Sequence, residues 1–104
     1  MLMSQPSDVA KLLQDLGNNP AEVASALRVK GVQGVRNTVR GLNPIVRCVE
    51  AHVPDAWNWN VSQGNTLSMN FRDGRKGTVA LPEAVKQFLD AFNRGAYPEL
   101  ELPP

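Results

Sequence analysis

The spacing of apolar residues predicts a helix close to the start of the chain. Ser7 can cap this helix, and Gly17 can end it in the left-handed conformation. Between them, four apolar residues fall at i, i+3, i+4 and i+7, which places them on one face: Val9, Leu12, Leu13 and Leu16.

Three more helices are predicted further along the chain. Two begin at Asn-Pro pairs, at residues 19–20 and 43–44, because asparagine caps a helix and proline suits its first position. The first of them ends near Gly31 and the second before Pro54. The fourth covers about residues 82–94 and carries an apolar stripe: Val85, Phe88, Leu89 and Phe92.

Between the third and fourth helices the apolar residues alternate with polar ones, which is typical of strands. The alternating residues form three groups: Trp57, Trp59 and Val61; then Leu67, Met69 and Phe71; then Val79 and Leu81. A turn at 63–65 and the hairpin dipeptide at 73–74 separate the groups. We expect Trp57 and Trp59 to share a face, in the core or as an exposed stacking platform.

The order of these elements predicts an α+β fold in one domain, residues 1–104. It has three N-terminal helices, a three-stranded antiparallel meander (about 56–81) and a C-terminal helix (about 82–94) packed on one face of the sheet. The apolar residues of the tail, from about residue 96 on, are expected to strap onto the core. The connector 32–42 is open to two interpretations, a set of turns or one short helix, because valines at near-helical spacing alternate with glycines.

Composition places the chain in a broad class. A single cysteine excludes an internal disulfide framework and fits a reducing compartment. The first residues lack the basic and long apolar regions of a secretory signal, and no stretch has the roughly 20 apolar residues of a membrane span. The expectation is a soluble cytoplasmic protein with no membrane partner.

Charge is distributed in blocks although the net charge is only +1. Residues 28–49 carry five cationic side chains and no acid, and residues 72–76 carry three cations and one acid. Such asymmetry can mark a surface for an anionic partner. The predicted contact residues are those of the connector and of the hairpin tip: Arg36, Arg40, Arg72, Arg75 and Lys76.

Little in the sequence indicates catalysis. Cys48 and His52 lie four residues apart on one predicted helix and could form a nucleophile–base pair, but a buried cysteine beside an ordinary histidine is the commoner arrangement. These two residues are too few for a structural zinc site, and the carboxylates are spread singly along the chain. We therefore predict no catalytic residues, no metal and no cofactor.

Two nucleic-acid folds merit comparison. The segment "GVQG" at 31–34 has the GxxG spacing of KH domains, but Lys30 and Asn37 stand where those loops have apolar flanks. Three helices followed by a hairpin with a basic tip match the order of a winged helix. However, the helix that would read DNA is short and offers one cation, Arg47, and one acid, Glu50.

From about residue 20 to 100 the chain resembles a group of short uncharacterised bacterial proteins, of actinobacterial and phage type. The resemblance rests on a G-[IV]-x-G phrase, a [CN]-P-[IL] phrase and a closing Gly-x-Tyr-Pro-Glu-Leu phrase, here "GVQG", "NPI" and "GAYPEL". Asn43 stands where the group often has cysteine, which favours a helix cap over a nucleophile or ligand at this position. Cys48 stands where the group has tyrosine. The resemblance implies a fold and no activity.

These observations together predict a small non-enzymatic protein-interaction or regulatory module with a basic contact surface. The expected partner is an unidentified protein. The alternative is a winged-helix-like protein that binds nucleic acid, and the oligomeric state is left open.

Overall fold

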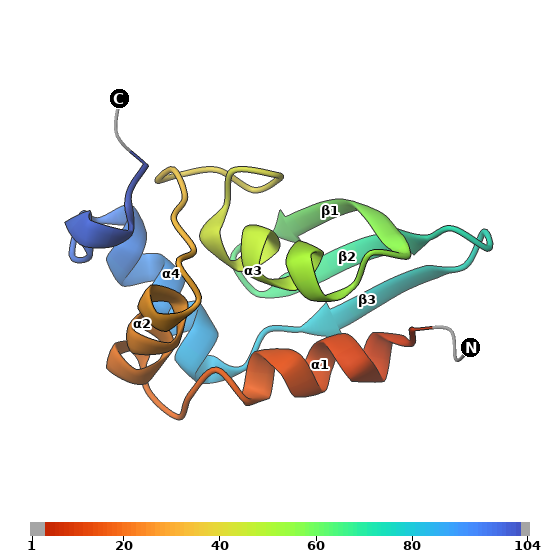
Figure 1. The fold of residues 1–104 in the computed structure, drawn as a ribbon, viewed down its shortest axis with the longest axis horizontal. Coiled ribbons are helices and arrows are strands. Elements are labelled where there is room, and N and C mark those ends of the chain that lie inside the picture. The colour runs from red at the N-terminus through yellow and green to blue at the C-terminus, as the bar shows by residue number, and fades with distance from the viewer. Residues whose placement is uncertain (1–3, 103–104) are drawn as a thin grey trace.

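The computed structural model describes residues 4–102 and confirms the predicted α+β architecture (Figure 1). Three helices precede the sheet, and a fourth helix and a 3-10 turn follow it. In chain order the elements are α1 (Pro6–Gln14), α2 (Pro20–Val29), α3 (Pro44–His52), β1 (Ala56–Ser62), β2 (Thr66–Phe71), β3 (Lys76–Ala80), α4 (Glu83–Asn93) and η1 (Pro98–Leu100). No helix in the described part of the chain is long and apolar enough to cross a membrane.

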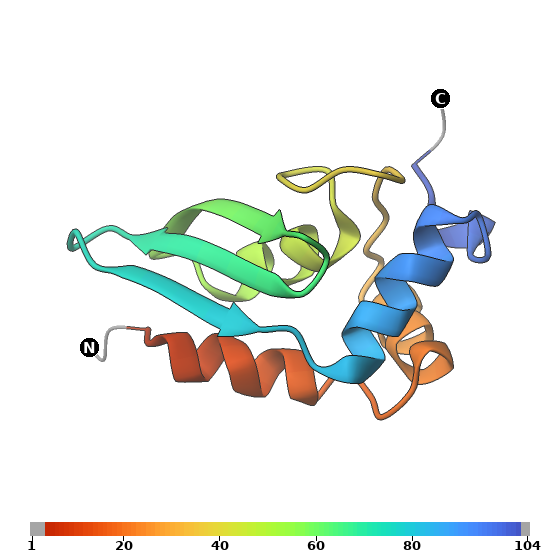
Figure 2. The same ribbon diagram turned by 180° about the vertical axis from the view of Figure 1, so that it is seen from behind.

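The sheet is an antiparallel meander with the order β1-β2-β3. Cross-strand rows such as Val61–Leu67–Val79 point to the buried face, since each of these side chains is at most 8% exposed. The alternate rows point to the other face. Figures 1 and 2 show that the helices that cover the sheet lie on one face, and that no helix covers the second face.

Two helices cover the buried face, and the other two extend the core beyond the end of the sheet. α3 packs against β1 and α1 packs against β3, whereas α2 packs mainly against α4 (Figure 2). Gly77 of β3 permits the close approach of α1, because a Cβ there would lie 2.9 Å from Cγ of Pro6 and 2.8 Å from Sδ of Met69. At the far end, Phe88 stacks on Tyr97 with ring centroids 5.2 Å apart.

The helix caps follow from the local sequence. Asn19 Oδ1 accepts a hydrogen bond from Glu22 N (2.9 Å), as expected for an N-cap. Asn43 Oδ1 accepts from Ile45 N (2.9 Å) and Val46 N (3.2 Å), so its predicted capping role is confirmed. The prediction for the first helix was wrong by two residues. Gln5 is the cap and Pro6 the first helical residue, because proline already has the required φ.

The alternation of Trp57 with Trp59 does not survive in the sheet. Trp59 is buried (3% exposed), but Trp57 is 52% exposed, and Ala56 takes the inward position in its place. The cause is a β-bulge between Trp57 and Asn60, where Asn58 adopts a left-handed φ of 57°. The expectation that both tryptophans share a face was therefore wrong, because the extra residue reverses the side-chain alternation.

Candidate functional site

The connector forms a compact loop over residues 35–42, which we call the 35–42 loop. Its ends meet where Val35 N donates to Leu42 O (2.8 Å). Inside it, Thr38 Oγ1 donates to Val35 O (2.7 Å), and Asn43 Nδ2 donates to Thr38 O (2.9 Å). Surface loops with adjoining ends and internal contacts of this kind are frequently functional. The prediction was open between turns and a short helix, and the structure has turns.

Hydrogen bonds from three distant parts of the chain hold this region in place. Gly34 N donates to Leu100 O (2.8 Å), and Leu102 N donates to Gly34 O (2.9 Å). Asn37 N donates to Asn93 Oδ1 at the end of α4 (2.9 Å). The loop also contacts the free edge of the sheet, since Val61 N donates to Val39 O (2.7 Å). These contacts fix the loop against α4, β1 and the C-terminal segment.

The two glycines of the "GVQG" segment have separate structural roles. Gly31 ends α2 with a φ of 70°, a conformation that glycine adopts without strain. Gly34 has an ordinary φ but no space for a side chain: a Cβ would lie 2.7 Å from both Leu42 O and Pro44 N. The segment therefore closes a helix and passes tightly beneath the loop.

The 35–42 loop presents apolar side chains to solvent. Three of the large hydrophobic residues that remain exposed belong to it: Val35 (37%), Val39 (48%) and Leu42 (48%). An open hollow of about 590 Å³ lies between the loop and Glu50 of α3. A second hollow, of about 510 Å³, continues past Glu50 along Val32, Arg47 and Ala51. We call this region the loop surface: Val32, Val35, Val39, Arg40, Leu42, Arg47 and Glu50.

The two predicted cations of the connector have different surroundings. Arg36 Nε is 3.0 Å from Glu101 Oε1, an ion pair that joins the loop to the C-terminal segment. Arg40 makes only a long hydrogen bond to Asn58 Oδ1 (3.4 Å). Within residues 4–102, neither Arg40 nor Arg47 takes part in an ion pair. The charge of Arg36 is thus paired with an acid of the fold, whereas no described carboxylate pairs with Arg40 or Arg47.

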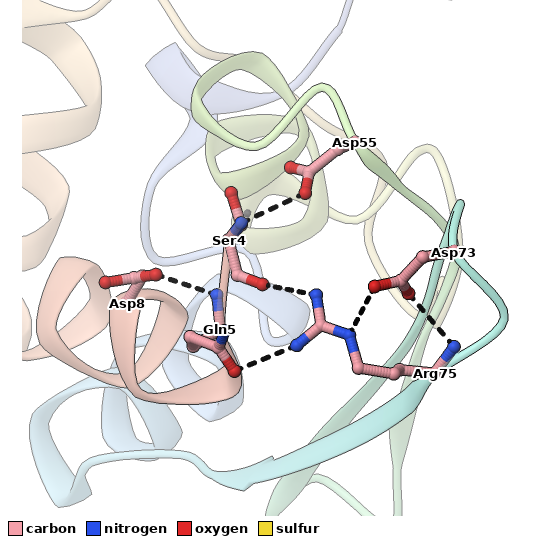
Figure 3. Close-up of polar contacts among 6 residues, drawn as sticks. All are labelled: Ser4, Gln5, Asp8, Asp55, Asp73 and Arg75. Carbon is pink, nitrogen blue, oxygen red and sulfur yellow. Dashed lines mark hydrogen bonds and ion pairs between the residues drawn. The ribbon is translucent and has the colours of Figure 1, made fainter. Parts of the chain in front are cut away.

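The structure does not bring the hairpin cations to the same place. The β2–β3 turn and the 35–42 loop lie well apart along the molecule (Figure 1). Arg75 points back to the N-terminal segment, where it donates to Ser4 O (2.9 Å) and Gln5 Oε1 (2.8 Å) and lies 2.6 Å from Asp73 Oδ2 (Figure 3). Its guanidinium also lies over the Phe71 ring, 4.8 Å from the centroid.

Arg72 and Lys76 differ from Arg75. Arg72 Nε donates weakly to Pro54 O (3.4 Å), and Lys76 is exposed at the start of β3 without an ion pair to the described residues. The five predicted contact residues therefore occupy at least two separate regions, and Arg75 serves mainly to hold the N-terminal segment on the sheet.

Acidic groups complete this N-terminal contact, which we call the Arg75 clasp: Ser4, Gln5, Asp55, Asp73 and Arg75. Hydrogen bonding from Ser4, whose N–H lies 3.1 Å from Oδ2, holds the pKa of Asp55 below its usual value. The N–H of Arg75 does the same for the pKa of Asp73 (3.1 Å), and its guanidinium adds to the effect. Both carboxylates are thus stabilised in their charged form.

Cys48 and His52 do not form a nucleophilic pair. Cys48 is fully buried, and this burial raises the pKa of its thiol, which disfavours the reactive thiolate. Nδ1 of His52 lies 3.1 Å from the carbonyl oxygen of Cys48. This contact engages Nδ1 with the helix backbone, since a carbonyl oxygen can only accept a hydrogen bond. In residues 4–102, no three metal-ligating side chains of His, Cys, Asp or Glu converge.

The apolar part of the loop surface was not predicted from the sequence. The near-helical spacing of Val35, Val39 and Leu42 suggested an inward-facing stripe, whereas the loop leaves all three partly in solvent. In the sequence, Glu50 and Arg47 were considered only as the acid and the cation of a helix that would read DNA.

Comparison with protein-family models, with curated proteins and with solved structures found no match.

Proposed function

We propose that this protein is a small non-enzymatic binding module that engages a partner protein through the loop surface. The observation that carries the proposal is the clustering of Val35, Val39 and Leu42, all 37–48% exposed, on one fixed loop. Single exposed hydrophobic residues are common, but a contiguous apolar group rimmed by charge is typical of an interaction site.

The rigidity of the loop supports this role. Its backbone is tied to η1, α4 and β1, so that little conformational freedom would be lost on binding. The hollows on either side of Glu50 give the surface relief into which partner side chains could insert. A pre-organised apolar centre with a polar rim is the usual anatomy of a protein interface.

The charges at the rim indicate the chemistry of the partner. Arg40 and Arg47 lack ion pairs in the described part of the chain, and Glu50 is the acid between the two hollows. A segment that combines aliphatic or aromatic side chains with two or more carboxylates would complement this surface. Arginine is well suited to this purpose because its guanidinium binds a carboxylate through two parallel hydrogen bonds.

A displayed random-peptide library selected on the immobilised protein tests the proposal. Peptides that bind should combine apolar with acidic residues. A synthetic peptide of the enriched sequence should bind Leu42→Asp at least about tenfold less tightly than wild type. It should also bind Arg40→Glu less tightly than wild type, and this loss of affinity should be larger at low salt than at high salt. Affinities are measured by isothermal titration calorimetry.

Val29→Asp is the matched control, because Val29 is 86% exposed on α2 and lies outside the loop surface. It places the same charge on an exposed aliphatic position and should leave peptide affinity unchanged. The proposal fails if no peptide is enriched, or if Leu42→Asp and Val29→Asp bind the enriched peptide equally.

The winged-helix alternative has less support. A DNA-reading helix normally packs on the helix before it, whereas α2 packs mainly against α4 here. The exposed residues of α3 are Arg47, Glu50, Ala51 and His52, which offer few groups for base edges. Arg75, at the tip of the would-be wing, is engaged in the clasp. The alternative predicts salt-sensitive duplex binding that Arg47→Ala weakens, measured by fluorescence anisotropy.

A further inference from the structure

The uncovered face of the sheet carries an unusual set of side chains. Its three cross-strand rows are Trp57–Asn70–Lys76, Asn60–Ser68–Thr78 and Ser62–Thr66–Ala80. Six of these nine residues bear an amide or a hydroxyl group, one is aromatic, one is cationic and none is acidic. Figure 2 shows this side of the sheet with no helix in front of it. We call this surface the open sheet face.

Trp57 is the one large apolar side chain on the open sheet face. It is 52% exposed, although the bulge that turns it outward requires Asn58 to adopt a left-handed φ of 57°. Asparagine is among the few non-glycine residues that adopt this conformation readily, so Asn58 favours the bulge locally. With ordinary alternation, the same indole would have been directed toward the core next to Trp59. The sheet therefore presents an aromatic ring to solvent where burial would have stabilised it.

The neighbours of Trp57 make a platform of polar side chains. Asn70 lies directly opposite on β2 and Lys76 opposite Asn70 on β3, about 10 Å from Trp57 across two strand spacings. The residues of the other two rows are short, and several are held down by bonds to the sheet itself, such as Ser68 Oγ to Asn60 O (3.3 Å) and Thr66 Oγ1 to Ser62 O (3.4 Å). Nothing along these rows projects as far as the indole.

The electrostatic character of the platform is positive. Lys76 is exposed and forms no ion pair with the described residues, and Arg40 reaches the β1 edge at Asn58 beside Trp57. Lys76 thus lies two strands away from the indole on β3, and Arg40 of the 35–42 loop contacts the residue that follows Trp57 on the β1 edge. Because no carboxylate occupies the rows, an anion that crosses the sheet meets no like charge.

We propose that the open sheet face binds single-stranded nucleic acid. One base stacks on Trp57, the phosphates on either side meet Lys76 and Arg40, and Asn70 offers its amide to a base edge. This combination of an exposed aromatic ring with flanking cations on a sheet is the physical basis of sequence-tolerant recognition of single strands. The proposal goes beyond the loop surface and does not depend on it, although Arg40 borders both.

Charge distinguishes this ligand from the others that an exposed tryptophan could bind. A neutral glycan would use the indole and the amides but would gain nothing from Lys76 or Arg40. A partner protein would be expected to meet a larger apolar area than a single indole among short polar side chains. In duplex DNA the bases are paired and stacked inside the double helix, so that they could not stack on the Trp57 ring. A single strand is the class that uses both the ring and the cations.

Tryptophan fluorescence provides a direct test, because the two tryptophans differ in exposure. Titration with a fifteen-nucleotide oligothymidylate and with an oligouridylate of the same length should quench Trp57, and the buried Trp59 should report little change. Fluorescence anisotropy of a labelled oligothymidylate gives the affinity independently. Trp57→Ala should abolish the quenching and weaken the affinity at least about fivefold, the lower end of the contribution of one stacked base.

Charge variants and competing ligands complete the test. Lys76→Glu should weaken binding and flatten its salt dependence, whereas Lys30→Glu, an equal change at an exposed lysine of the α2 C-terminus, should have a smaller effect. Neither Trp57→Ala nor Lys76→Glu should alter peptide binding at the loop surface, so failure of one proposal leaves the other standing. The inference is overturned if the single strands do not bind, if Trp57→Ala binds them as wild type does, or if a neutral cello-oligosaccharide quenches Trp57 more strongly than the single strands do.

Discussion

At the scale of single residues, Gly34 is required because the backbone of the 35–42 loop and of Pro44 passes too close to it to leave room for a side chain. Gly34 lies under the 35–42 loop where a Cβ would meet Leu42 O and both N and Cδ of Pro44 at 2.7 Å. Its own N–H and C=O are bonded to the C-terminal segment, so it cannot move away without breaking those bonds. Gly41, in the same loop, has open space around it and no positive φ.

This contrast predicts that Gly34→Ala destabilises the protein and Gly41→Ala does not. We expect Gly34→Ala to lower the free energy of unfolding by about 1–3 kcal/mol, as is typical when a methyl group is forced into a packed position. Gly41→Ala should leave it unchanged or raise it by up to about 1 kcal/mol, because alanine restricts the unfolded chain. Urea denaturation followed by circular dichroism measures both. Equal effects of the two variants would contradict the steric argument.

Burial of Cys48 gives a second prediction at this scale. Its fully buried thiol, with a raised pKa, should react with a disulfide reagent such as DTNB only when the protein opens. The reaction should be slow in buffer, accelerate with urea and reach the rate of a free thiol in the unfolded chain. Since the chain has one cysteine, the absorbance change reports this site alone. Rapid reaction of the native protein would reopen the possibility of a nucleophilic role for Cys48.

At the scale of elements, the sequence predicted those features that depend on near neighbours along the chain. Caps at Asn19 and Asn43 and the turn at 73–74 each arise within a few residues, and the structure confirms them. The 35–42 loop depends on contacts with Leu100, Asn93 and Val61, which no local pattern reveals. The bulge that exposes Trp57 likewise breaks the alternation on which the strand prediction relied.

In the candidate site, too, the sequence predicted local features but not those that depend on distant residues. The cationic block was visible in the sequence, and it led to Arg40. The sequence could not show that Glu101 neutralises Arg36 or that Arg75 holds Ser4, because the partners lie 65 and 71 positions away. The exposure of Val39 and Leu42 is also a tertiary property, since their spacing equally fits a buried helical face.

Asn43 links the 35–42 loop to α3, and this position leads to a prediction. Asn43 is 2% exposed, and its side-chain amide accepts from two N–H groups of α3 and donates to Thr38 O in the loop. Asn43→Ala leaves these buried groups without partners and should destabilise the protein by about 2–3 kcal/mol. Asn19→Ala, which removes an exposed cap with one bond, should cost about 1 kcal/mol or less. Thermal and urea unfolding compare the two, and an equal loss would refute the added role of burial.

At the scale of the whole molecule, the first and the last described segments, residues 4–5 and 98–102, are tied to the rest of the fold by hydrogen bonds. The C-terminal segment buries Leu100 and bonds to Gly34, and Glu99 accepts hydrogen bonds from Arg28 of α2, with Nε at 2.9 Å. The N-terminal segment is held by the Arg75 clasp at the opposite end of the sheet (Figure 3). Both ties depend on carboxylates, so the stability of the molecule should depend on pH.

The sign of this dependence follows from the pKa shifts. Hydrogen bonding by Ser4, Arg75 and Arg28 lowers the pKa of Asp55, Asp73 and Glu99 in the folded state. A carboxyl group whose pKa is lower in the folded state binds fewer protons there than in the unfolded chain. Its stabilising contribution is complete above the unfolded values of about 4 and is lost as the pH falls through the folded values.

We therefore predict that the urea midpoint is nearly constant from pH 7 to about pH 5 and decreases below about pH 4. Asp73→Asn should lower the midpoint at neutral pH and reduce its change on acidification, because the asparagine cannot carry the charge that Arg75 stabilises. Asp15→Asn makes the same substitution at the exposed C-cap of α1, a position with no side-chain hydrogen bond or ion pair to the described residues, and should leave the pH dependence unchanged. In NMR spectra, the Arg75 Nε–H and Ser4 amide signals should shift over the same acidic range. A profile identical for wild type and Asp73→Asn would show that the clasp does not contribute to stability, and that the N-terminal segment is held by the packing of Pro6 on Gly77 alone.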